Sequence, residues 1–217
     1  MTGPDVPYLK QKMIGSCGPA CVQMVCGWLR SESTVLVGSE MVPWARSWIF
    51  PFGMTESFGL ARLLRDVGAE VTVYKERPGF SLHPAGDSPM ARMFRVFGLG
   101  ASPVARWRTV RALGKGVEVV LGPVTLELLD ANDPALLPAI IMVNQGVYAP
   151  DPDWPEGVLH WVVVTGIDPE HVRFHDPDLG PDQEVGRPVF ERAMDVRPMG
   201  IDRQMVVARP GASLPSR

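Results

Sequence analysis

The sequence lacks a long apolar run. No stretch in its 217 residues approaches the roughly 18 to 20 consecutive apolar residues of a membrane-spanning helix. Residues 1–12 also lack a basic segment followed by an apolar one, which is the pattern of a secretory signal peptide. We therefore expect no membrane span and no secretion signal.

Cysteines and clusters of basic residues are also scarce. The three cysteines, Cys17, Cys21 and Cys26, are odd in number and close together, which excludes a disulfide framework and favours a reducing compartment. The formal net charge is -3 without a basic stripe, so we expect no nucleic-acid partner. These absences favour a cytoplasmic protein, and they leave the oligomeric state open.

The composition is that of one globular domain. With 217 residues, of which 46% are hydrophobic and 21% are charged, we expect a single domain over residues 1–217. The 22 glycines and 22 prolines predict many turns. Helical patterns in the first half and strand patterns in the second half predict an α+β fold, with an antiparallel sheet.

Helix signals lie in the first third of the chain. A helix is predicted over residues 17–29, with Ser16 as its N-cap and apolar residues at helical spacing. A second helix is predicted to begin at the cap Thr55 and to end at Gly68, and a strand is predicted over residues 70–74.

The second half of the chain carries the other strand signals. Strands are predicted over residues 138–143, 160–168, 171–176 and 203–209. The two middle strands are separated by a turn at residues 168–170, so they should pair as a hairpin. Residues 5–12 are predicted to be a short extended segment that leads into the first helix.

Residues 76–110 differ from the rest of the chain and are predicted to be an irregular insertion with one helix. The segment is rich in glycine and proline, and its aromatic and basic residues include Phe94, Phe97, Trp107, Arg92, Arg95, Arg106 and Arg108. Two interpretations remain open. These side chains form a surface element that contacts substrate, or the aromatic rings cover the sheet.

Cys17 is the candidate nucleophile. A thiol attacks carbonyl groups as the thiolate, and the unpaired N–H groups at a helix N-terminus lower its pKa. Cys17 lies where the first helix should start, whereas Cys21 and Cys26 lie deeper in it, where thiols are packing groups. Gln11 precedes Cys17 by six residues, and its amide together with the N–H of Cys17 could stabilise an oxyanion.

His160 and Asp176 are the candidate partners of Cys17. They lie about eight residues on either side of the predicted hairpin turn, so they should finish side by side at the open end of the hairpin. A carboxylate in that position could hold one imidazole nitrogen and leave the other nitrogen for the thiol, which is the arrangement of a nucleophilic triad.

The sequence resembles the papain-like cysteine peptidases of family thirty-nine, which include the domains that cut after double-glycine leaders. The similar stretches are VPYLKQKMIGSCGPACVQMV, HWVVVTGID and VRFHDPDLG, and residues 76–135 have no counterpart. The resemblance implies a papain-like α+β fold with the nucleophile helix packed on an antiparallel sheet. It also implies that Gln11 is the oxyanion donor, Cys17 the nucleophile, His160 the base and Asp176 the residue that orients it.

The resemblance implies a cysteine peptidase-like hydrolase that acts on a peptide or acyl substrate through an acyl-enzyme. Two alternatives stay open: an acyltransferase or cyclase that uses the same thioester intermediate, and an inactive peptide-binding module. No GxxxxGK[ST] phosphate loop is present, so the ATP-binding region of transporter-linked members is missing. No cofactor is expected.

A metal site is the remaining alternative, because Cys17, Cys21, His171 and His175 are all possible ligands. The two histidines lie four residues apart on a predicted strand, which separates them by about 13 Å at the usual rise. That distance is too wide for one ion, so no metal is expected.

Overall fold

The structure of the chain is a computed structural model that describes residues 3–30, 47–49, 54–77, 103–130, 136–153, 157–197 and 201–212. The helices in these ranges are α1 (Cys17–Arg30), α3 (Ser57–Asp66), α5 (Pro103–Gly114), α6 (Glu127–Asp130), the short 3-10 helix η3 (Gln145–Val147) and α7 (Arg187–Met194). The strands are β1 (Trp48–Ile49), β2 (Met54–Thr55), β3 (Glu70–Lys75), β4 (Glu118–Leu121), β5 (Ala139–Asn144), β6 (Leu159–Ile167), β7 (His171–Asp176), β8 (Gly180–Gly186) and β9 (Gln204–Arg209).

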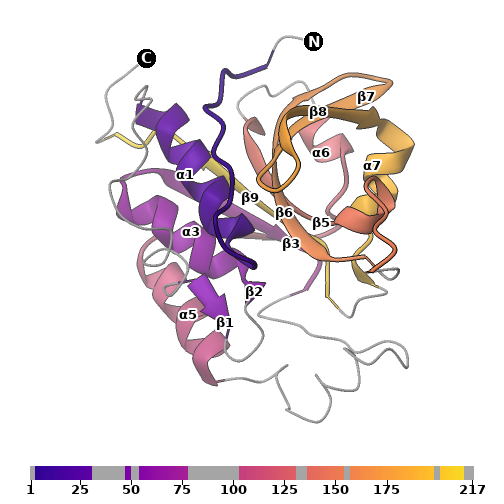
Figure 1. The fold of residues 1–217 in the computed structure, drawn as a ribbon. Coiled ribbons are helices and arrows are strands. Elements are labelled where there is room, and N and C mark those ends of the chain that lie inside the picture. The colour runs from indigo at the N-terminus through magenta and orange to yellow at the C-terminus, as the bar shows by residue number, and fades with distance from the viewer. Residues whose placement is uncertain are drawn as a thin grey trace.

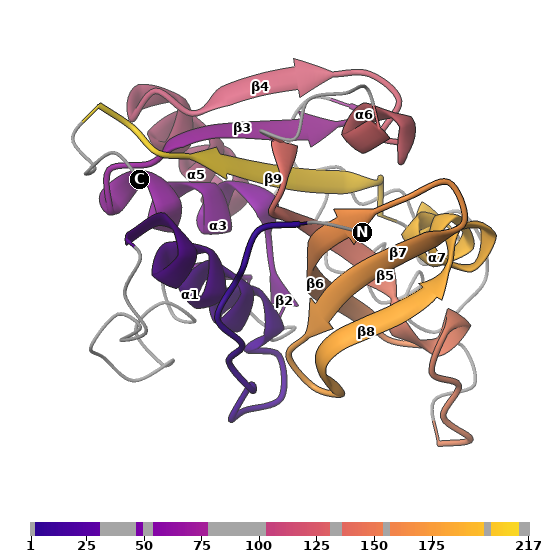
Figure 2. The same cartoon turned by 90° about the horizontal axis from the view of Figure 1, so that it is seen from above.

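One large sheet organises the described part of the chain. It has seven strands in the order β4-β3-β9-β5-β6-β7-β8. Every neighbouring pair is antiparallel except β3 and β4, which run parallel. Figure 2 shows β3, β4 and β9 side by side, and β5 to β8 curling away from them. The sheet thus draws on both halves of the chain, which differs from the predicted division into a helical half and a sheet half.

Two hydrophobic clusters lie on the two faces of this sheet. On one face α1 and α3 pack against strand residues such as Val73, Trp161 and Val206. On the other face Phe190 of α7 packs among residues such as Phe174. Figure 1 shows α1 and α3 on one side of the strands and α7 on the other. Strand residues therefore alternate between two apolar layers, which explains why β5 and β6 are almost continuously hydrophobic.

Helix α1 confirms the predicted helix over residues 17–29. The backbone N–H of Ala20 donates to the carbonyl oxygen of Ser16 at 3.0 Å, so Ser16 directly precedes the first turn. The hydroxyl of Ser16 donates to the carbonyl oxygen of Met13 at 2.8 Å. The helix is buried almost all round, and Cys21 donates its thiol hydrogen to the carbonyl oxygen of Trp161 in β6.

Helix α3 corrects one prediction and confirms another. The prediction of Thr55 as the N-cap is wrong, because the cap is Glu56 in an extended conformation, while Thr55 belongs to β2. Gly68 follows the end of the helix with a φ of 92°. The N–H groups of Gly68 and Ala69 donate to the carbonyl oxygens of Arg65 and Leu64, which is the hydrogen-bond pattern of a Schellman motif.

The predicted strands over residues 70–74, 138–143, 160–168, 171–176 and 203–209 correspond to β3, β5, β6, β7 and β9 within one residue at each end. Strands β4 and β8 and helix α7 were not predicted. Of the predicted insertion, residues 78–102 lie outside the described residues, and these include Phe94, Phe97, Arg92 and Arg95. Residues 103–110 belong to α5.

The β6–β7 hairpin contains one irregularity. Its turn is closed by Asp168, whose carboxylate oxygen Oδ1 accepts hydrogen bonds from the N–H groups of Glu170 and His171. Near the turn Ile167 pairs with Val172, but farther away Val163 pairs with His175. The register therefore shifts by one residue between Val164 and Gly166, which makes a β-bulge at position 165.

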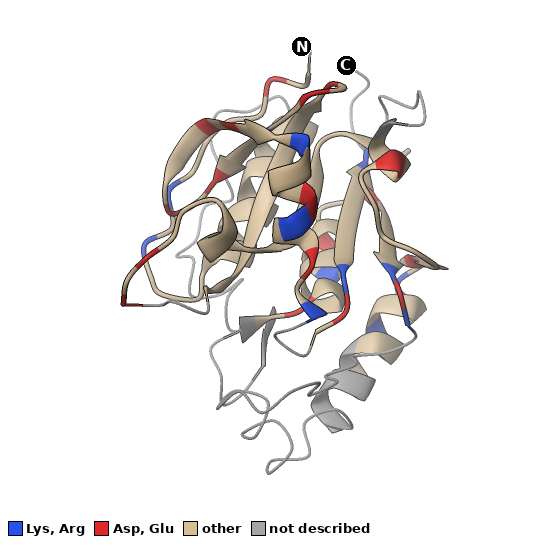
Figure 3. Ribbon diagram, turned by 90° about the vertical axis from the view of Figure 1, so that its right-hand side faces the viewer, with Lys and Arg blue, Asp and Glu red and all other residues tan. Residues whose placement is uncertain are grey.

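Charged residues of both signs are interspersed along the described ribbon, as Figure 3 shows. In the part of the chain that the structure describes, no helix combines the length and the apolar character that crossing a membrane requires.

Candidate active site

Cys17 is the first residue of α1, so its side chain lies at the positive end of the helix. It is buried at 7% exposure. Glycine fits the next position without a clash, whereas a Cβ at Gly18 would lie 2.3 Å from Oγ1 of Thr55 and force that side chain to shift. Gly18 thus lets β2 approach the start of α1 closely. The backbone N–H groups of Gly18 and Trp161 form hydrogen bonds that lower the pKa of the Cys17 thiol.

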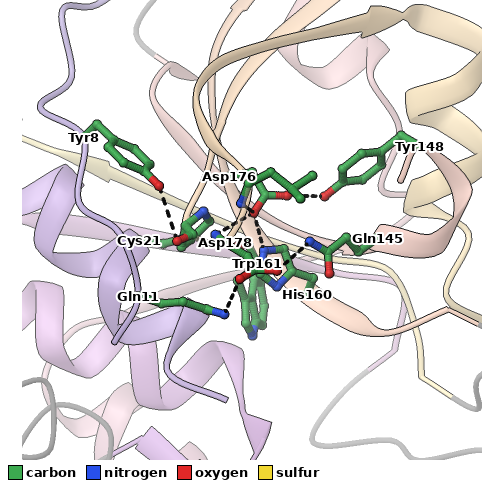
Figure 4. A network of polar contacts seen from close by, with 11 residues as sticks. Tyr8, Gln11, Cys21, Gln145, Tyr148, His160, Trp161, Asp176 and Asp178 are labelled. Carbon is green, nitrogen blue, oxygen red and sulfur yellow. Dashed lines mark hydrogen bonds and ion pairs between the residues drawn. The ribbon is translucent and has the colours of Figure 1, made fainter. Parts of the chain in front are cut away.

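His160 and Asp176 come from neighbouring strands and contact each other directly. Nε2 of His160 lies 2.8 Å from Oδ1 of Asp176, and both side chains are buried. Figure 4 shows this contact at the centre of a polar network. Because Asp176 engages Nε2, Nδ1 is the ring nitrogen left for the nearby Cys17, which raises the pKa of His160.

The pKa shifts of Cys17 and His160 favour opposite charges on the two groups. Burial raises the pKa of Cys17, but the nearby His160 and its hydrogen bond outweigh burial and bring that pKa below its usual value. Burial lowers the pKa of His160, but Cys17 and the hydrogen bond to Asp176 together raise it. The arrangement stabilises a thiolate beside an imidazolium.

Asp176 is held as a carboxylate by four hydrogen bonds. Besides the contact with His160, Oδ1 accepts from the N–H groups of Asp178 at 2.8 Å and Leu179 at 3.1 Å. Oδ2 accepts from the hydroxyl of Tyr148 at 2.8 Å. Burial alone would raise the pKa of Asp176, but the hydrogen bonds from His160 and Tyr148 lower it. The carboxylate therefore has a fixed orientation and keeps its charge.

Cys21 and Cys26 have the opposite electrostatic environment. Burial, together with the neighbouring Cys17, raises the pKa of Cys21 well above its usual value. Burial raises the pKa of Cys26 to about 12. All three cysteines are free thiols, but only Cys17 has a lowered pKa among them.

Gln11 lies beside the turn that follows β7. Its N–H donates to the carbonyl oxygen of Pro177 at 2.8 Å, and its side-chain Nε2 donates to Oδ1 of Asp178 at 3.3 Å. The segment before it follows the same turn, since the hydroxyl of Tyr8 donates to the carbonyl oxygen of Pro177 and Val6 contacts His175. Residues 3–11 thus place Gln11 beside Pro177, the residue that directly follows Asp176.

Three residues of this network were missed by the sequence analysis: Gln145, Tyr148 and Asp178. Gln145 and Tyr148 follow β5, the strand that pairs with β6, so polar residues after that strand could have been expected near His160. Asp178 lies only two residues after Asp176. The sequence feature that could have predicted these three residues is the group of polar side chains that follows the ends of neighbouring strands.

Exposed apolar side chains lie close in sequence to each member of the predicted triad. Ile14 precedes Cys17 by three residues and is 99% exposed. Val158 precedes His160 by two residues, and Leu179 follows Asp176 by three, and both are partly exposed.

The residues considered as metal ligands do not form a cluster. Within the described residues, no group of three or more histidine, cysteine, aspartate or glutamate side chains could hold a metal ion. Nε2 of His175 instead contacts the carbonyl oxygen of Val6 at 2.8 Å, and Nδ1 of His175 accepts from the N–H of Asp182 at 3.1 Å.

Comparison with known proteins identifies the fold. No protein-family model matches the chain, and no curated protein matches its sequence. The peptidase domain of Streptococcus ComA, a bifunctional ABC transporter involved in a quorum-sensing pathway, matches with a TM-score of 0.53 at 15% identity, over 94% of this chain and 98% of that domain. A double-glycine motif protease from an AMS/PCAT transporter, in complex with its leader peptide, has a TM-score of 0.49 at 15% identity, with coverages of 96% and 94%. A family-thirty-nine-like peptidase from Bacillus anthracis has a TM-score of 0.45 at 16% identity, with coverages of 95% and 96%.

The chain therefore has a papain-like α+β fold, the class of fold that cysteine peptidases use. Within that class, its fold is similar to that of the ComA peptidase domain, which confirms the papain-like α+β fold that the sequence resemblance predicted. At this level of identity the similarity establishes the fold alone, so the chemistry has to be argued from the residues of this chain.

Proposed function

We propose that this protein is a cysteine peptidase-like hydrolase that cleaves a peptide or amide bond through an acyl-enzyme on Cys17. The observation that carries the proposal is the buried 2.8 Å contact between His160 and Asp176, with Cys17 at the start of α1; this arrangement lowers the pKa of Cys17 and raises that of His160. A thiolate beside an imidazolium is the resting state that acyl transfer by cysteine requires.

In the proposed reaction the Cys17 thiolate attacks the carbonyl carbon of the scissile bond. The negative charge that develops on the carbonyl oxygen is stabilised by the side-chain amide of Gln11 and the N–H of Cys17. The imidazolium of His160 gives its proton to the leaving amine, which leaves a thioester on Cys17. His160 then takes a proton from water, the resulting hydroxide attacks the thioester, and the acid product leaves with the thiolate restored.

Asp176 has an orienting role in this mechanism. Its contact with Nε2 of His160 favours the tautomer whose Nδ1 faces the thiol, and its charge stabilises the imidazolium. Tyr148 supports the carboxylate from the other side. The group is thus a Cys–His–Asp triad with a tyrosine behind it.

A peptide is the substrate class that we propose. The fold is that of a peptidase domain in a similar solved structure. The exposed Ile14, Val158 and Leu179 lie next to the triad members along the chain, which supports substrates with apolar side chains near the scissile bond. Three free thiols, one of them reactive, suit a reducing compartment such as the cytoplasm.

The experiment that tests this function is hydrolysis of a library of peptide aminomethylcoumarin amides. Wild-type protein should release the fluorophore, Cys17→Ala should not, and acid-quenched samples analysed by intact mass should carry the acyl group on Cys17. If added glycine amide takes up the acyl group, so that a new amide forms in place of the acid, the protein is a transferase instead. If the wild-type protein forms no acyl-enzyme at all, both the hydrolase and the transferase are contradicted, and a peptide-binding module is the remaining alternative.

Limited alkylation tests the reactive state directly. Because only Cys17 has a lowered pKa among the three thiols, iodoacetamide at pH 6 to 7 should label Cys17 ahead of Cys21 and Cys26. Peptide mapping by mass spectrometry gives the labelled position. Faster labelling of either other cysteine would contradict the assignment of the nucleophile.

A further inference from the structure

The side chain of Gln11 has one hydrogen-bond partner in the described part of the chain, and that partner is a carboxylate. Its nitrogen, Nε2, donates to Oδ1 of Asp178 at 3.3 Å, as Figure 4 shows. Its oxygen, Oε1, is buried and accepts no hydrogen bond from the residues described. The contact with Asp178 therefore decides which end of the Gln11 amide faces which way.

A carboxylate is suited to this task because it accepts hydrogen bonds and does not donate them. Only the nitrogen end of an amide can pair with it, so Asp178 rejects the inverted orientation of Gln11. The amide nitrogen carries two hydrogens. When one is held by Asp178, the other stays free for a developing oxyanion. An inverted amide would turn its oxygen toward that negative charge and repel it.

Asp178 is itself fixed from two sides. Its backbone N–H donates to Oδ1 of Asp176 at 2.8 Å, which ties the residue to the triad carboxylate. Its second oxygen, Oδ2, accepts from Nε2 of Gln145 at 3.3 Å. Gln145 is held in turn by its N–H, which donates to the carbonyl oxygen of Val158 at 2.9 Å. A single carboxylate thus links the β5 end of the network to the segment that carries Gln11.

We propose that Asp178 is a positioning residue that keeps the nitrogen of the Gln11 amide directed at the oxyanion. The inference rests on the proposed acyl-transfer function, and it adds a residue that neither the sequence motifs nor the triad geometry requires. The side chain of Asp178 is exposed, while its backbone makes the contact with Asp176. Truncation to alanine consequently removes the contacts to the two glutamines, keeps the support of the triad and opens no cavity in the core.

The test compares two reactions of Cys17, one that develops an oxyanion and one that does not. The first is acylation by p-nitrophenyl acetate, followed by release of p-nitrophenol, and the second is alkylation by iodoacetamide. Gln11→Ala should lower the acylation rate by roughly 10²- to 10³-fold, the usual loss for one oxyanion donor. Asp178→Ala should lower it by roughly tenfold to a hundredfold, as expected for a displaced catalytic group. Neither variant should change the alkylation rate.

The double variant decides whether Asp178 acts through Gln11. In the Gln11→Ala background, Asp178→Ala should have an effect of less than about twofold on acylation, because the group that it positions is already missing. The matched control is Glu184→Ala, which removes an exposed carboxylate of β8 that pairs with Arg173. This control should leave both reactions unchanged.

The failures of the inference and of the proposed function are distinguishable. If Asp178→Ala acylates at the wild-type rate, if its effect persists in the Gln11→Ala background, or if it slows alkylation equally, the positioning role is wrong while the function stands. If wild-type Cys17 is not acylated at all, the proposed function is wrong and the inference fails with it.

Discussion

The first turn of α1 and the interior of the same helix each carry a cysteine, and the surroundings of the two thiols shift their pKa in opposite directions. Cys17 at the helix start has a lowered pKa, and Cys21 one turn later has a strongly raised one. Both are buried, so burial does not separate them. What separates them is a basic partner, because the nearby His160 lowers the pKa of Cys17, whereas the thiol of Cys21 donates to the carbonyl oxygen of Trp161. The difference in pKa between these two thiols therefore depends on a side chain of β6, the strand beside the helix.

Replacement of the cysteines should give the largest contrast. Cys17→Ala is expected to abolish peptide hydrolysis and ester acylation, because no other group described near His160 can take its place as nucleophile. Cys26→Ala is the matched control, since it removes a buried thiol from the same helix. It should keep full turnover per folded molecule. Activity is measured with the coumarin peptides, and folding by circular dichroism. Turnover by Cys17→Ala at the wild-type rate would show that Cys17 does not differ in function from the other thiols of α1.

Asp176→Asn should have the next largest effect. An amide can present its nitrogen to His160, which favours the wrong tautomer and removes the charge that stabilises the imidazolium. We expect turnover to fall by roughly 10²- to 10⁴-fold. The pKa of Cys17 should move back toward its usual value, which the pH dependence of iodoacetamide alkylation measures. An enzyme that works at nearly the wild-type rate would leave a Cys–His dyad.

Tyr148→Phe should have a smaller effect that depends on pH. Loss of a hydrogen bond to a buried charged group is expected to lower the free energy of unfolding by about 1.5 to 3 kcal/mol. The pKa of Asp176 is lowered in the folded protein, so the stability that it contributes is lost as pH falls through the folded value. Without Tyr148 that value rises, so acid unfolding should begin at a higher pH. Unchanged acid unfolding, measured by fluorescence, would exclude the support role.

Trp107→Ala should have the smallest effect and tests the region that the family resemblance does not cover. Trp107 is 50% exposed, and the guanidinium carbons of Arg62 and Arg111 lie over its ring, 5.9 Å and 4.7 Å from the ring centroid. Loss of exposed cation–π contacts costs about 0.5 to 1 kcal/mol each. A buried core tryptophan would cost about 3 to 5 kcal/mol.

Kinetics separate the two interpretations of residues 76–110. Acylation by the small ester should be unchanged in Trp107→Ala. A rise in KM for peptides alone would support a substrate-contacting segment, and urea unfolding gives the stability. A loss of several kcal/mol without any kinetic change would contradict that interpretation.

Much of the site could be predicted because its elements are buried and strongly patterned. Helix α1 and strands β6 and β7 pack on both faces, so their apolar residues marked them clearly. The hairpin, with the one bulge that the sequence did not reveal, then brought His160 and Asp176 together. The missed elements β4 and β8 are edge strands with few buried residues, so neither has the regular alternation of buried and exposed positions that marks a strand. Helix α7 has eight residues, too few for a clear helical period.

The contacts of Gln11 could not be predicted in the same way. A glutamine side chain can rotate about each of its χ angles, so its hydrogen-bond partner decides the orientation of the amide group. That partner, Asp178, belongs to a turn after β7, and the sequence does not show which way an exposed side chain in a turn points. The role proposed for Gln11 came from the spacing to Cys17, whereas the restraint on it came from the structure.

The bulge at position 165 ties the spacing of the hairpin to the chemistry. Residues that face each other across antiparallel strands share one face of the sheet, and a slip of one residue exchanges the faces. Beyond the bulge Val163 pairs with His175, so the next position along each strand sets Asp176 opposite Val162. Val162 and His160 lie two residues apart on β6, so Asp176 lies on the same face of the sheet as His160. Without the extra residue, Asp176 would stand opposite Val163 and project from the other face.

The number of residues between His160 and Asp176 is therefore subject to a parity rule. Relatives of this chain should gain or lose residues in that hairpin in pairs, or move the bulge, and a single deletion should separate the imidazole from its carboxylate with every strand still formed.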